Sequence, residues 1–502
     1  MNTSKQPDWR QLAERLAVSG APFIDGKPHP IPDARQSTTI NPVDGSDGFT
    51  FTDGGAAAID AAVRAARAAW ENGWRDCGPA GRRQRLLALA DAILAHGDEL
   101  ALCDCLDIGK PIAAARGEVF PAAGFIRYYA EAIDKLHAGQ VAPTGAGALE
   151  LQLWRPRGVV GAITPWNFPL INACLKLGPA LAAGNTAVIK PSELSPRSAL
   201  LLAQLAQDCG IPAGVINVVP GGGATGEALV RHPGVDMLTF TGSTATGKSI
   251  LQGIGGSTIK PVLLECGGKS PEILFEDVAG LGLAEVAAQV VRGAFWNQGQ
   301  VCVARSRLLV QQSLYQPMVD AVVAVAASLQ PGDPLEMSTT FGPLASSRQR
   351  TVVEGYIQSG IDDGARLALD GRNPAGFEQG CYLAPTVFVD VPPAARIARE
   401  EIFGPVLCVM PFADEEEALA LANATEYGLA ATIWTRDIGR AQRVAGRVQA
   451  GKVRVVASLA QVEGAGFSHS AEPCGQSGYG VEGGPDGLRS YMRRQSVELA
   501  AG

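Results

Sequence analysis

Short apolar runs rich in β-branched residues alternate along this chain with longer stretches rich in alanine and leucine. The short runs have the length of buried strands, and a proline or glycine follows each within two residues; they lie at 159–164, 185–189, 215–219 and 237–240. The longer stretches have helical character and lie at 56–70, 83–108 and 195–209. Strands that alternate with helices predict an α/β fold with a largely parallel sheet.

Length and net charge narrow the classes of function. At 502 residues the chain is long for one core, so we expect two or more domains. Its formal net charge of −8 disfavours nucleic acid as a partner, because phosphate binding needs a basic surface. No apolar run approaches the ~18 residues of a membrane-spanning helix, and residues 1–15 are polar. We therefore expect a cytoplasmic protein that binds neither nucleic acid nor membrane.

The ten cysteines and five histidines do not form a metal-binding pattern. Cys103 and Cys105 are the only close pair, no CxxC pair occurs and the histidines are scattered, so we expect no metal site. In a cytosolic chain most of these thiols should be small, buried, apolar side chains. A catalytic cysteine must therefore be identified by its surroundings.

Cys302 has such surroundings. It ends the uncharged run FWNQGQVC at 295–302, which combines aromatic residues, amides and glycine. A catalytic thiol must be reachable and must lie beside donors that stabilise charge. Two further segments accompany it, ITPWNFP at 163–169 and LECGGKSP at 264–271. Each segment alone has an ordinary structural explanation, and only their joint occurrence carries functional information.

In combination, these three segments resemble the signature set of the NAD(P)-dependent aldehyde dehydrogenases. The similarity extends from about residue 23 to residue 497 and keeps the family's order of motifs. Further matching segments are KLGPAL at 176–181, GNT at 184–186 with KPSE at 190–193, and EEIFGPV at 400–406. The segment YYAEAIDK at 128–135 is similar to the bacterial ω-aminoaldehyde dehydrogenases.

The resemblance implies an aldehyde-dehydrogenase-like α/β fold with three parts. These are a Rossmann-like cofactor-binding domain at 1–140 and 160–267, an α/β catalytic domain at 268–478, and a β oligomerisation arm at 141–159 and 479–502. The segments 149–155 and 489–499 are β-rich and lie outside the main alternation, as strands of an arm would. Such an arm would add to a partner's sheet, so we expect a homodimer or a homotetramer by analogy with the family.

The reaction implied by the resemblance is oxidation of a small-molecule aldehyde to the carboxylic acid with NAD. Cys302 would add to the aldehyde as a thiohemiacetal, and loss of hydride would then leave a thioester. The side-chain amide of Asn167 and the backbone N–H of Cys302 would stabilise the oxyanion. Glu265 would activate the water that hydrolyses the thioester, and its flanking glycines would leave it room to move.

The same resemblance assigns residues that bind the nucleoside parts of the cofactor. Lys190 and Glu193 would bind the hydroxyls of the adenosine ribose. The Glu193 carboxylate would repel a 2′-phosphate, so NAD is favoured over NADP. Glu401 would hold the nicotinamide ribose, and Phe403 would pack against the nicotinamide ring.

Two glycine-rich motifs leave alternatives open. The motif GGGATG at 221–226 matches the dinucleotide-binding pattern, but the acidic residue expected about 20 positions later is missing, so a plain turn explains it equally well. The motif GSTATGKS at 242–249 matches a P-loop, so a nucleotide triphosphatase is an alternative function. In the resembling family such a loop starts a helix beside the cofactor diphosphate, which would contact Gly242, Ser243 and Trp166.

Three positions beside these motifs depart from the family pattern. Cys266 stands where leucine is common, a change from which we expect little effect. Arg305 stands where glycine is usual, and its side chain either stabilises the thiolate or points outward. If the backbone there needs a positive φ, arginine would strain it. Leu175 stands where many members carry tryptophan, which would open one wall of the substrate tunnel.

The largest departure is the segment 451–475, which should line the substrate entrance. His469 and Glu472 within it would either recognise a polar substrate or make local loop contacts. A departure of this size leaves a catalytically inactive structural member of the family as a further alternative. The intact Cys302, Asn167 and Glu265 argue against that alternative.

Overall fold

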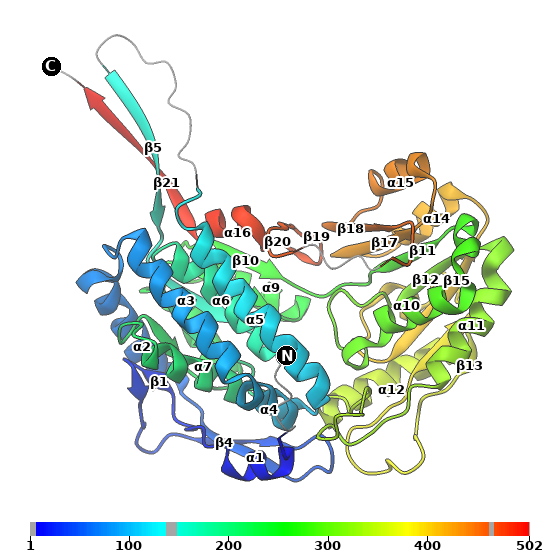
Figure 1. The fold of residues 1–502 in the computed structure, drawn as a ribbon, viewed down its shortest axis with the longest axis horizontal. Coiled ribbons are helices and arrows are strands. Elements are labelled where there is room, and N and C mark those ends of the chain that lie inside the picture. Colours follow the sequence, from blue (N-terminus) through cyan, green and yellow to red (C-terminus); the bar gives the residue numbers. More distant parts are fainter. Residues whose placement is uncertain (1–6, 137–147, 461–465, 501–502) are drawn as a thin grey trace.

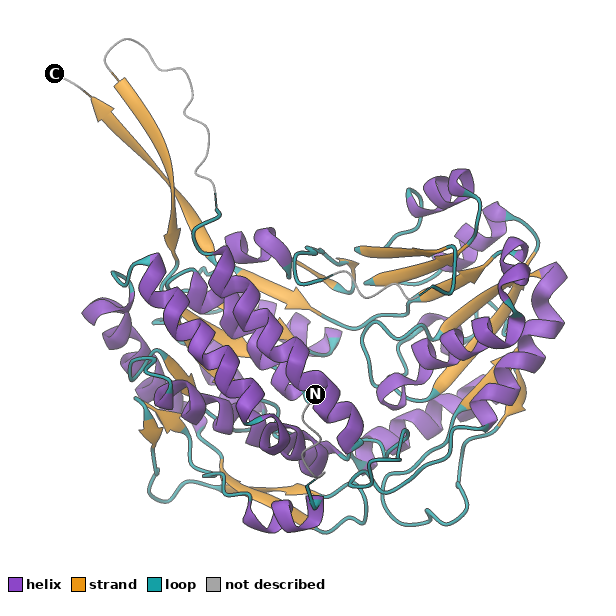
Figure 2. Cartoon of the chain, in the orientation of Figure 1, coloured by secondary structure: helices purple, strands orange, loops and turns teal. Residues whose placement is uncertain are grey.

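The computed structural model describes residues 7–136, 148–460 and 466–500, which form two α/β lobes and a projecting arm (Figure 1). Each lobe is built on one mainly parallel sheet. Helices and strands alternate through both lobes (Figure 2), which confirms the predicted α/β fold.

The sheet of the first lobe has eight strands in the order β2-β1-β8-β7-β6-β9-β10-β20. Its strands are β1 (Phe23–Ile24), β2 (Lys27–Pro28), β6 (Val159–Ile163), β7 (Thr186–Lys190), β8 (Ile216–Val218), β9 (Met237–Thr241), β10 (Val262–Glu265) and β20 (Gly478–Tyr479). The strands from β6 to β10 are parallel, and the four runs predicted as strands form β6, β7, β8 and β9. After β8 the chain crosses back over β7 and β6 to form β9, so the strand order reverses between β6 and β9.

Helices cover both faces of this sheet because each face is apolar. The helices of this lobe are α1 (Trp9–Arg15), α2 (Gly55–Ala69), α3 (Pro79–Ala95), α4 (Gly97–Ile108), α5 (Ile112–Ala132), α6 (Pro169–Ala182), α7 (Arg197–Asp208), α8 (Gly223–Arg231), α9 (Thr244–Gly255) and α16 (Gly484–Ser490). On one face, Leu86 of α3 and Leu177 of α6 belong to the larger core. On the other face, Ile59 of α2 and Ile250 of α9 belong to a second core.

The stretch predicted to be helical at 83–108 forms two helices, α3 and α4. His96, between α3 and α4, has φ −103° and ψ 26°, which is outside the helical region. The next residue packs tightly, because a Cβ on Gly97 would lie 2.9 Å from Cγ1 of Val119 in α5. The close approach of α5 requires glycine here, and the chain turns at this point.

The second lobe has a seven-stranded sheet in the order β13-β14-β15-β12-β11-β17-β18, with every strand parallel except β13. The strands are β11 (Pro271–Leu274), β12 (Arg307–Gln311), β13 (Arg366–Leu369), β14 (Thr386–Val389), β15 (Val406–Phe412), β17 (Ala430–Trp434) and β18 (Lys452–Val456). The helices are α10 (Leu283–Phe295), α11 (Tyr315–Ala327), α12 (Ser347–Asp362), α13 (Arg396–Arg399), α14 (Glu415–Ala422) and α15 (Ile438–Ala445). Two separate apolar cores lie on the two faces of this sheet.

The arm consists of β5 (Ala148–Pro156) and β21 (Met492–Ala500), which project from the first lobe (Figure 1). The two strands pair antiparallel over their full length, from Met492 opposite Pro156 to Ala500 opposite Ala148. The two β-rich segments of the sequence are therefore partners. Two short antiparallel pairs complete the strands, β3 (Gln36–Ile40) with β4 (Asp47–Thr52) and β16 (Tyr427–Gly428) with β19 (Cys474–Gly475).

Two kinds of feature do not occur in the part of the chain that the structure describes. None of its helices is both long and apolar enough to cross a bilayer. Within the same residues, no three His, Cys, Asp or Glu side chains are grouped so that they could hold a metal ion.

Candidate functional site

The predicted catalytic residues lie where the two lobes contact each other. The parallel strands β6, β7 and β10 end at one edge of the first sheet, where they deliver Asn167, Lys190 and Glu265. The strand order reverses at this edge, and α/β sheets bind nucleotides at such reversals. The second lobe contributes Cys302 and Glu401 from segments that precede the neighbouring parallel strands β12 and β15.

Two glycines that follow the Glu265 strand bring the lobes into close contact. A Cβ on Gly267 would overlap the carboxylate of Glu401, and a Cβ on Gly268 would lie 2.5 Å from the carbonyl oxygen of Cys302. The backbone N–H of Gly268 donates a 3.0 Å hydrogen bond to Oε1 of Glu401. Because Gly267 and Gly268 have no side chains, the backbone after Glu265 lies directly against Glu401 and the Cys302 carbonyl.

The turn before Cys302 contains three consecutive residues in the left-handed region. The φ values are 50° for Asn297, 56° for Gln298 and 70° for Gly299. Such angles are uncommon for residues other than glycine and often mark functional sites. A Cβ on Gly299 would overlap the carbonyl oxygen of Gly404, so only glycine fits there. The turn redirects the chain from α10 to the lobe boundary, where Cys302 is partly exposed.

The side chain of Asn167 is held in place by the loop that carries Cys302. Its Nδ2 donates to the carbonyl oxygen of Gln300 at 2.9 Å, which uses one amide N–H and leaves the other for a ligand. Its own backbone carbonyl accepts hydrogen bonds from Nζ of Lys110 at 2.8 Å and from Nδ2 of Asn297 at 3.2 Å. The amide is thus oriented before any substrate arrives.

Lys110 supports this arrangement, and the sequence analysis missed it. Its buried ammonium donates to both carboxylate oxygens of Glu118 at 2.6 Å and lies 4.0 Å from the centroid of the Phe168 ring. Burial raises the pKa of Glu118 to about 7, against the opposing charge of Lys110. Lys110 precedes Asn167 by 57 positions, so no local motif joins them. The only signal in the sequence is a glutamate inside an apolar helix.

The ionisable groups of the site have strongly shifted pKa values. Burial raises the pKa of the Cys302 thiol to about 12, and the carboxylates of Glu265 and Glu401 act in the same direction. Burial also raises the pKa of Glu265 well above its ordinary value, with Glu482 adding to the rise and Lys176 opposing it. Burial raises the pKa of Glu401 to about 7. Perturbed groups gathered in this way are typical of active sites.

Aromatic side chains flank the boundary on both sides. Trp166 and Phe403 meet edge to face with their ring centroids 5.3 Å apart. Phe403 has a φ of 56°, so a left-handed backbone presents its ring. Phe168 lies 5.1 Å from Trp296, which is 49% exposed. The structure therefore brings Trp166 and Phe403 together.

Lys190 and Glu193 lie together after β7, with Nζ 3.3 Å from Oε2. The Lys190 side chain is 7% exposed and that of Glu193 is 55% exposed. Burial lowers the pKa of Lys190. Among the described residues, Glu193 is the only hydrogen-bond partner of Nζ, so donors remain free on the ammonium and acceptors on the carboxylate. This donor set fits the vicinal hydroxyls of a ribose.

Ser243 caps α9, and its Oγ accepts a 3.3 Å hydrogen bond from the backbone N–H of Thr246. The helix begins at Thr244, so most of the motif at 242–249 is helical and does not form a loop around a triphosphate. Lys248 is exposed on that helix. The P-loop alternative therefore lacks structural support, whereas a helix N-terminus after β9 suits a diphosphate.

The glycine motif at 221–226 forms the start of α8, and side chains of the protein itself occupy that helix N-terminus. Oγ1 of Thr225 donates to Oδ1 of Asp53 at 2.6 Å, and the N–H of Gly55 donates to that same Oγ1 at 3.0 Å. The carboxylate of Asp53 thus lies at the N-terminus of α8, where a phosphate would bind. The arrangement favours a purely structural role for this motif over a role in dinucleotide binding.

Among the departures beside the motifs, Cys266 is buried, and Gly247 packs against its Sγ. Neither explanation offered for Arg305 describes what the structure shows. Its side chain is 17% exposed and lies 3.4 Å from the buried Glu272, and its φ is not in the positive region. Leu175 lies partly buried on α6, and the open tunnel wall stays a prediction.

The described part of the segment 451–475, which excludes 461–465, is held by local contacts. Oε1 of Glu472 accepts a 3.0 Å hydrogen bond from the backbone N–H of Gly480, which fits a loop contact. His469 is exposed, and its ring has no hydrogen bond among the described residues. Phe467 packs edge to face against Phe125 of α5 at 5.0 Å.

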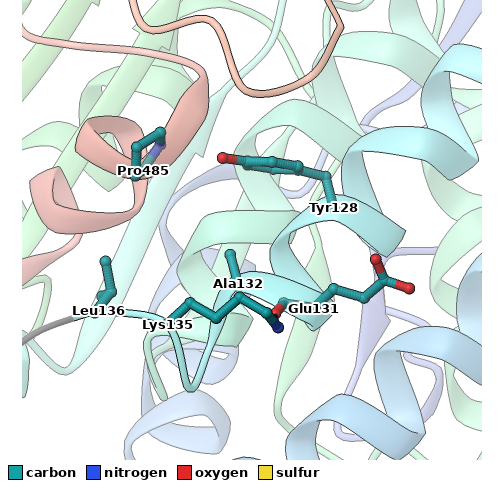
Figure 3. Close-up of a pocket in the computed structure, with 6 residues that line it drawn as sticks. All are labelled: Tyr128, Glu131, Ala132, Lys135, Leu136 and Pro485. Atoms are coloured by element: carbon teal, nitrogen blue, oxygen red, sulfur yellow. Dashed lines mark hydrogen bonds between the residues drawn. The ribbon is translucent and has the colours of Figure 1, made fainter.

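A separate cavity of about 230 Å³ lies between the end of α5 and α16 (Figure 3). It is lined by Tyr128, Glu131, Ala132, Lys135, Leu136 and Pro485. None of the predicted catalytic or cofactor-binding residues lines it, so it is distinct from the boundary site.

Comparison with known proteins agrees with the geometry. The profile of the aldehyde dehydrogenase family matches residues 31–497. The chain is 45% identical over 458 residues to the NADP/NAD-dependent aldehyde dehydrogenase PuuC of Escherichia coli (strain K12), with 91% of each chain covered. It is 42% identical over 451 residues to the aminoacetaldehyde dehydrogenase of Pseudomonas aeruginosa, which covers 89% of this chain and 90% of that one.

Solved structures extend the likeness to three dimensions. A mutant of the P. syringae indole-3-acetaldehyde dehydrogenase AldA, in complex with NAD+ and IAA, superimposes with a TM-score of 0.94 at 40% identity. The superposition covers 98% of this chain and 99% of that chain. The two-lobe architecture and the arm therefore belong to a known fold.

Proposed function

Because this chain belongs to the aldehyde dehydrogenase family, we propose that it oxidises an aldehyde to the carboxylic acid with NAD through a covalent bond to Cys302. One observation carries the proposal. Cys302, Asn167 and Glu265 come from segments distant in sequence and meet where the carboxyl ends of the parallel strands face the second lobe.

The first step uses Cys302 and Asn167. The Cys302 sulfur forms a bond to the aldehyde carbon, and the carbonyl oxygen becomes an oxyanion. The amide N–H of Asn167 that Gln300 does not occupy donates to this oxyanion, together with the backbone N–H of Cys302. The thiol must lose its proton to react, and burial beside two carboxylates makes this loss unfavourable in the free protein.

The second step needs the cofactor, which when bound accepts the hydride from the aldehyde carbon and so leaves a thioester on Cys302. Lys190 and Glu193 would hold its adenosine ribose, and Glu401 its nicotinamide ribose. The α9 N-terminus at Gly242 and Ser243 would face the diphosphate beside Trp166, and Phe403 would pack on the nicotinamide ring.

The third step belongs to Glu265. Its carboxylate takes a proton from water, the water oxygen bonds to the thioester carbon, and the C–S bond breaks to release the acid and the thiolate. A raised pKa suits this role, because a base whose pKa lies nearer to neutrality binds the proton more strongly during the transfer.

The direct test is formation of NADH at 340 nm with a panel of aldehydes. We expect turnover, with 4-aminobutyraldehyde among the better substrates, since the aminoacetaldehyde dehydrogenase is a relative. Short aliphatic, long aliphatic and aromatic aldehydes complete the panel. A folded protein that binds NAD but oxidises none of them would contradict the proposal and favour an inactive structural member of the family.

The same assay measures the cofactor preference. NAD should give a higher kcat/KM than NADP, because the half-exposed Glu193 carboxylate would meet the 2′-phosphate. Glu193→Gln should narrow this preference by raising activity with NADP. An unchanged ratio in that variant would assign the discrimination to other residues.

We also propose a homodimer or homotetramer in the cytoplasm, with a cofactor-binding domain at 1–140 and 160–267, a catalytic domain at 268–478 and an arm at 141–159 and 479–502. The arm supports this proposal because an isolated two-stranded ribbon is marginally stable in water and leaves two strand edges to pair. Light scattering should give the mass of two or four chains, and the mass of one chain would contradict the proposal.

A further inference from the structure

Arg305, three residues after Cys302, packs its side chain against α10. A Cβ on Gly293 of α10 would overlap the guanidinium, so the absence of a side chain there makes the space for it. Its Nη2 donates to the carbonyl oxygen of Gln289 at 3.1 Å, and its backbone N–H donates to the carbonyl oxygen of Gly293 at 3.2 Å. Both main chain and side chain of Arg305 are thus fixed to α10.

The partner of this guanidinium is a fully buried carboxylate. Oε1 of Glu272 lies 3.4 Å from Nη1 of Arg305 and accepts a 2.7 Å hydrogen bond from Nε1 of Trp434. Oε2 of Glu272 is buried and has no hydrogen-bond partner. A buried carboxylate needs a counter-charge, and the Arg305 guanidinium contacts it directly.

The position of Glu272 connects this pair to the segments that carry the proposed reactive groups. Glu272 lies in β11, which directly follows the segment that carries Glu265, Gly267 and Gly268. Arg305 follows the loop that carries Cys302. The pair therefore ties the segment of the nucleophile to the segment of the base, in addition to the contact between Gly268 and the Cys302 carbonyl.

We propose that Arg305 is a positioning residue, which through Glu272 and Gln289 holds the Cys302 loop at its working distance from Glu265. This inference rests on the proposed function. Loss of Arg305 leaves the charge of Glu272 buried, which destabilises the fold. The proposal predicts that kcat stays low even when this charge is also removed.

The test compares Arg305→Met with the double variant Arg305→Met/Glu272→Gln. The single variant removes the nearest cation of the buried Glu272 and leaves only the weaker influence of Arg454, so it should lower both Tm and activity. In the double variant the amide at 272 keeps an oxygen for Trp434 and carries no charge, so Tm should return toward that of the wild type. Arg443→Met is the matched control, because Arg443 pairs with Glu415 on the surface of the same lobe.

In the folded double variant we expect kcat to stay lower by about 10- to 100-fold, as a displacement near 1 Å can cost. The KM for NAD should stay within about twofold, because no proposed cofactor residue is changed. A double variant that regains both Tm and kcat would overturn the proposal, as would a folded Arg305→Met protein with normal kcat. If the double variant does not fold, Glu272→Gln alone provides the comparison, with reduced kcat expected and unchanged kcat overturning it.

A second readout separates this inference from the proposed function. Iodoacetamide alkylation of Cys302, followed on its own peptide by mass spectrometry, requires no aldehyde turnover. A loosened loop exposes the thiol to water and lowers its pKa. Each unit of that fall raises the thiolate fraction at fixed pH by about tenfold, which speeds alkylation by a smaller factor because a less basic thiolate is a weaker nucleophile. Faster alkylation in the double variant supports positioning even if the wild type oxidises no aldehyde, whereas an unchanged rate contradicts it.

Discussion

Replacing Cys302 by alanine should abolish aldehyde-dependent NADH formation, with a fall in turnover of roughly 10⁶-fold, as for the loss of other catalytic nucleophiles. Without the sulfur no C–S bond forms, so the aldehyde carbon never becomes the tetrahedral adduct that releases hydride. Steady-state assays at 340 nm with the best aldehyde of the panel measure the loss. The change removes one atom from a partly exposed side chain, so the fold should remain intact.

A control variant and a binding measurement accompany this test. Cys77→Ala removes another partly exposed thiol, which lies just before α3 and has no part in the proposed reaction, and should leave turnover unchanged. Binding of NAD to Cys302→Ala, followed by calorimetry, should match the wild type because no proposed cofactor contact is lost. Turnover within about tenfold of the wild type in a folded Cys302→Ala protein would remove the thiol from the mechanism.

The proposed reactive groups can be selected from the sequence because each lies in a compact local motif. Cys302 and Glu265 occur in runs whose composition is unusual within a few residues. The strands that deliver Asn167 and Lys190 are also local signals, since a buried β-branched run ends at a proline or glycine. The parallel α/β arrangement follows from the alternation of those runs with helices.

The sequence does not predict the contacts that orient these groups. Lys110 and Asn167 meet because α5 packs on α6, and a single sequence carries no sign of that packing. The sequence also gives no sign that Gly267 packs against Glu401 or Gly268 against the Cys302 carbonyl. The pairing of Arg305 with Glu272 is likewise a contact between separate segments.

Replacing Glu265 by glutamine should slow steady-state turnover by about 10²- to 10⁴-fold, the usual contribution of one positioned base. Acylation needs only Cys302, Asn167 and the cofactor, so the thioester should still form and then accumulate. A stopped-flow trace should therefore show a burst of about one NADH per site, followed by a slow phase. A steady rate equal to that of the wild type, without a burst, would contradict the role of Glu265 in hydrolysis.

The same substitution, which slows turnover, should make the Cys302 thiol more reactive. The Glu265 carboxylate is one cause of the raised pKa of Cys302, so Glu265→Gln should lower that pKa and speed alkylation of Cys302 by iodoacetamide in the NAD-free protein. The pKa of Glu265 is itself raised, so at low pH its carboxyl group is neutral and the two proteins should react alike. Their rates should separate only as pH rises through the Glu265 pKa, because only then does the wild type carry the opposing charge. Faster alkylation together with slower turnover in this variant would place Glu265 beside the thiol and assign it to the hydrolysis step. Equal alkylation of the two proteins at every pH would show that the charge of Glu265 does not reach Cys302.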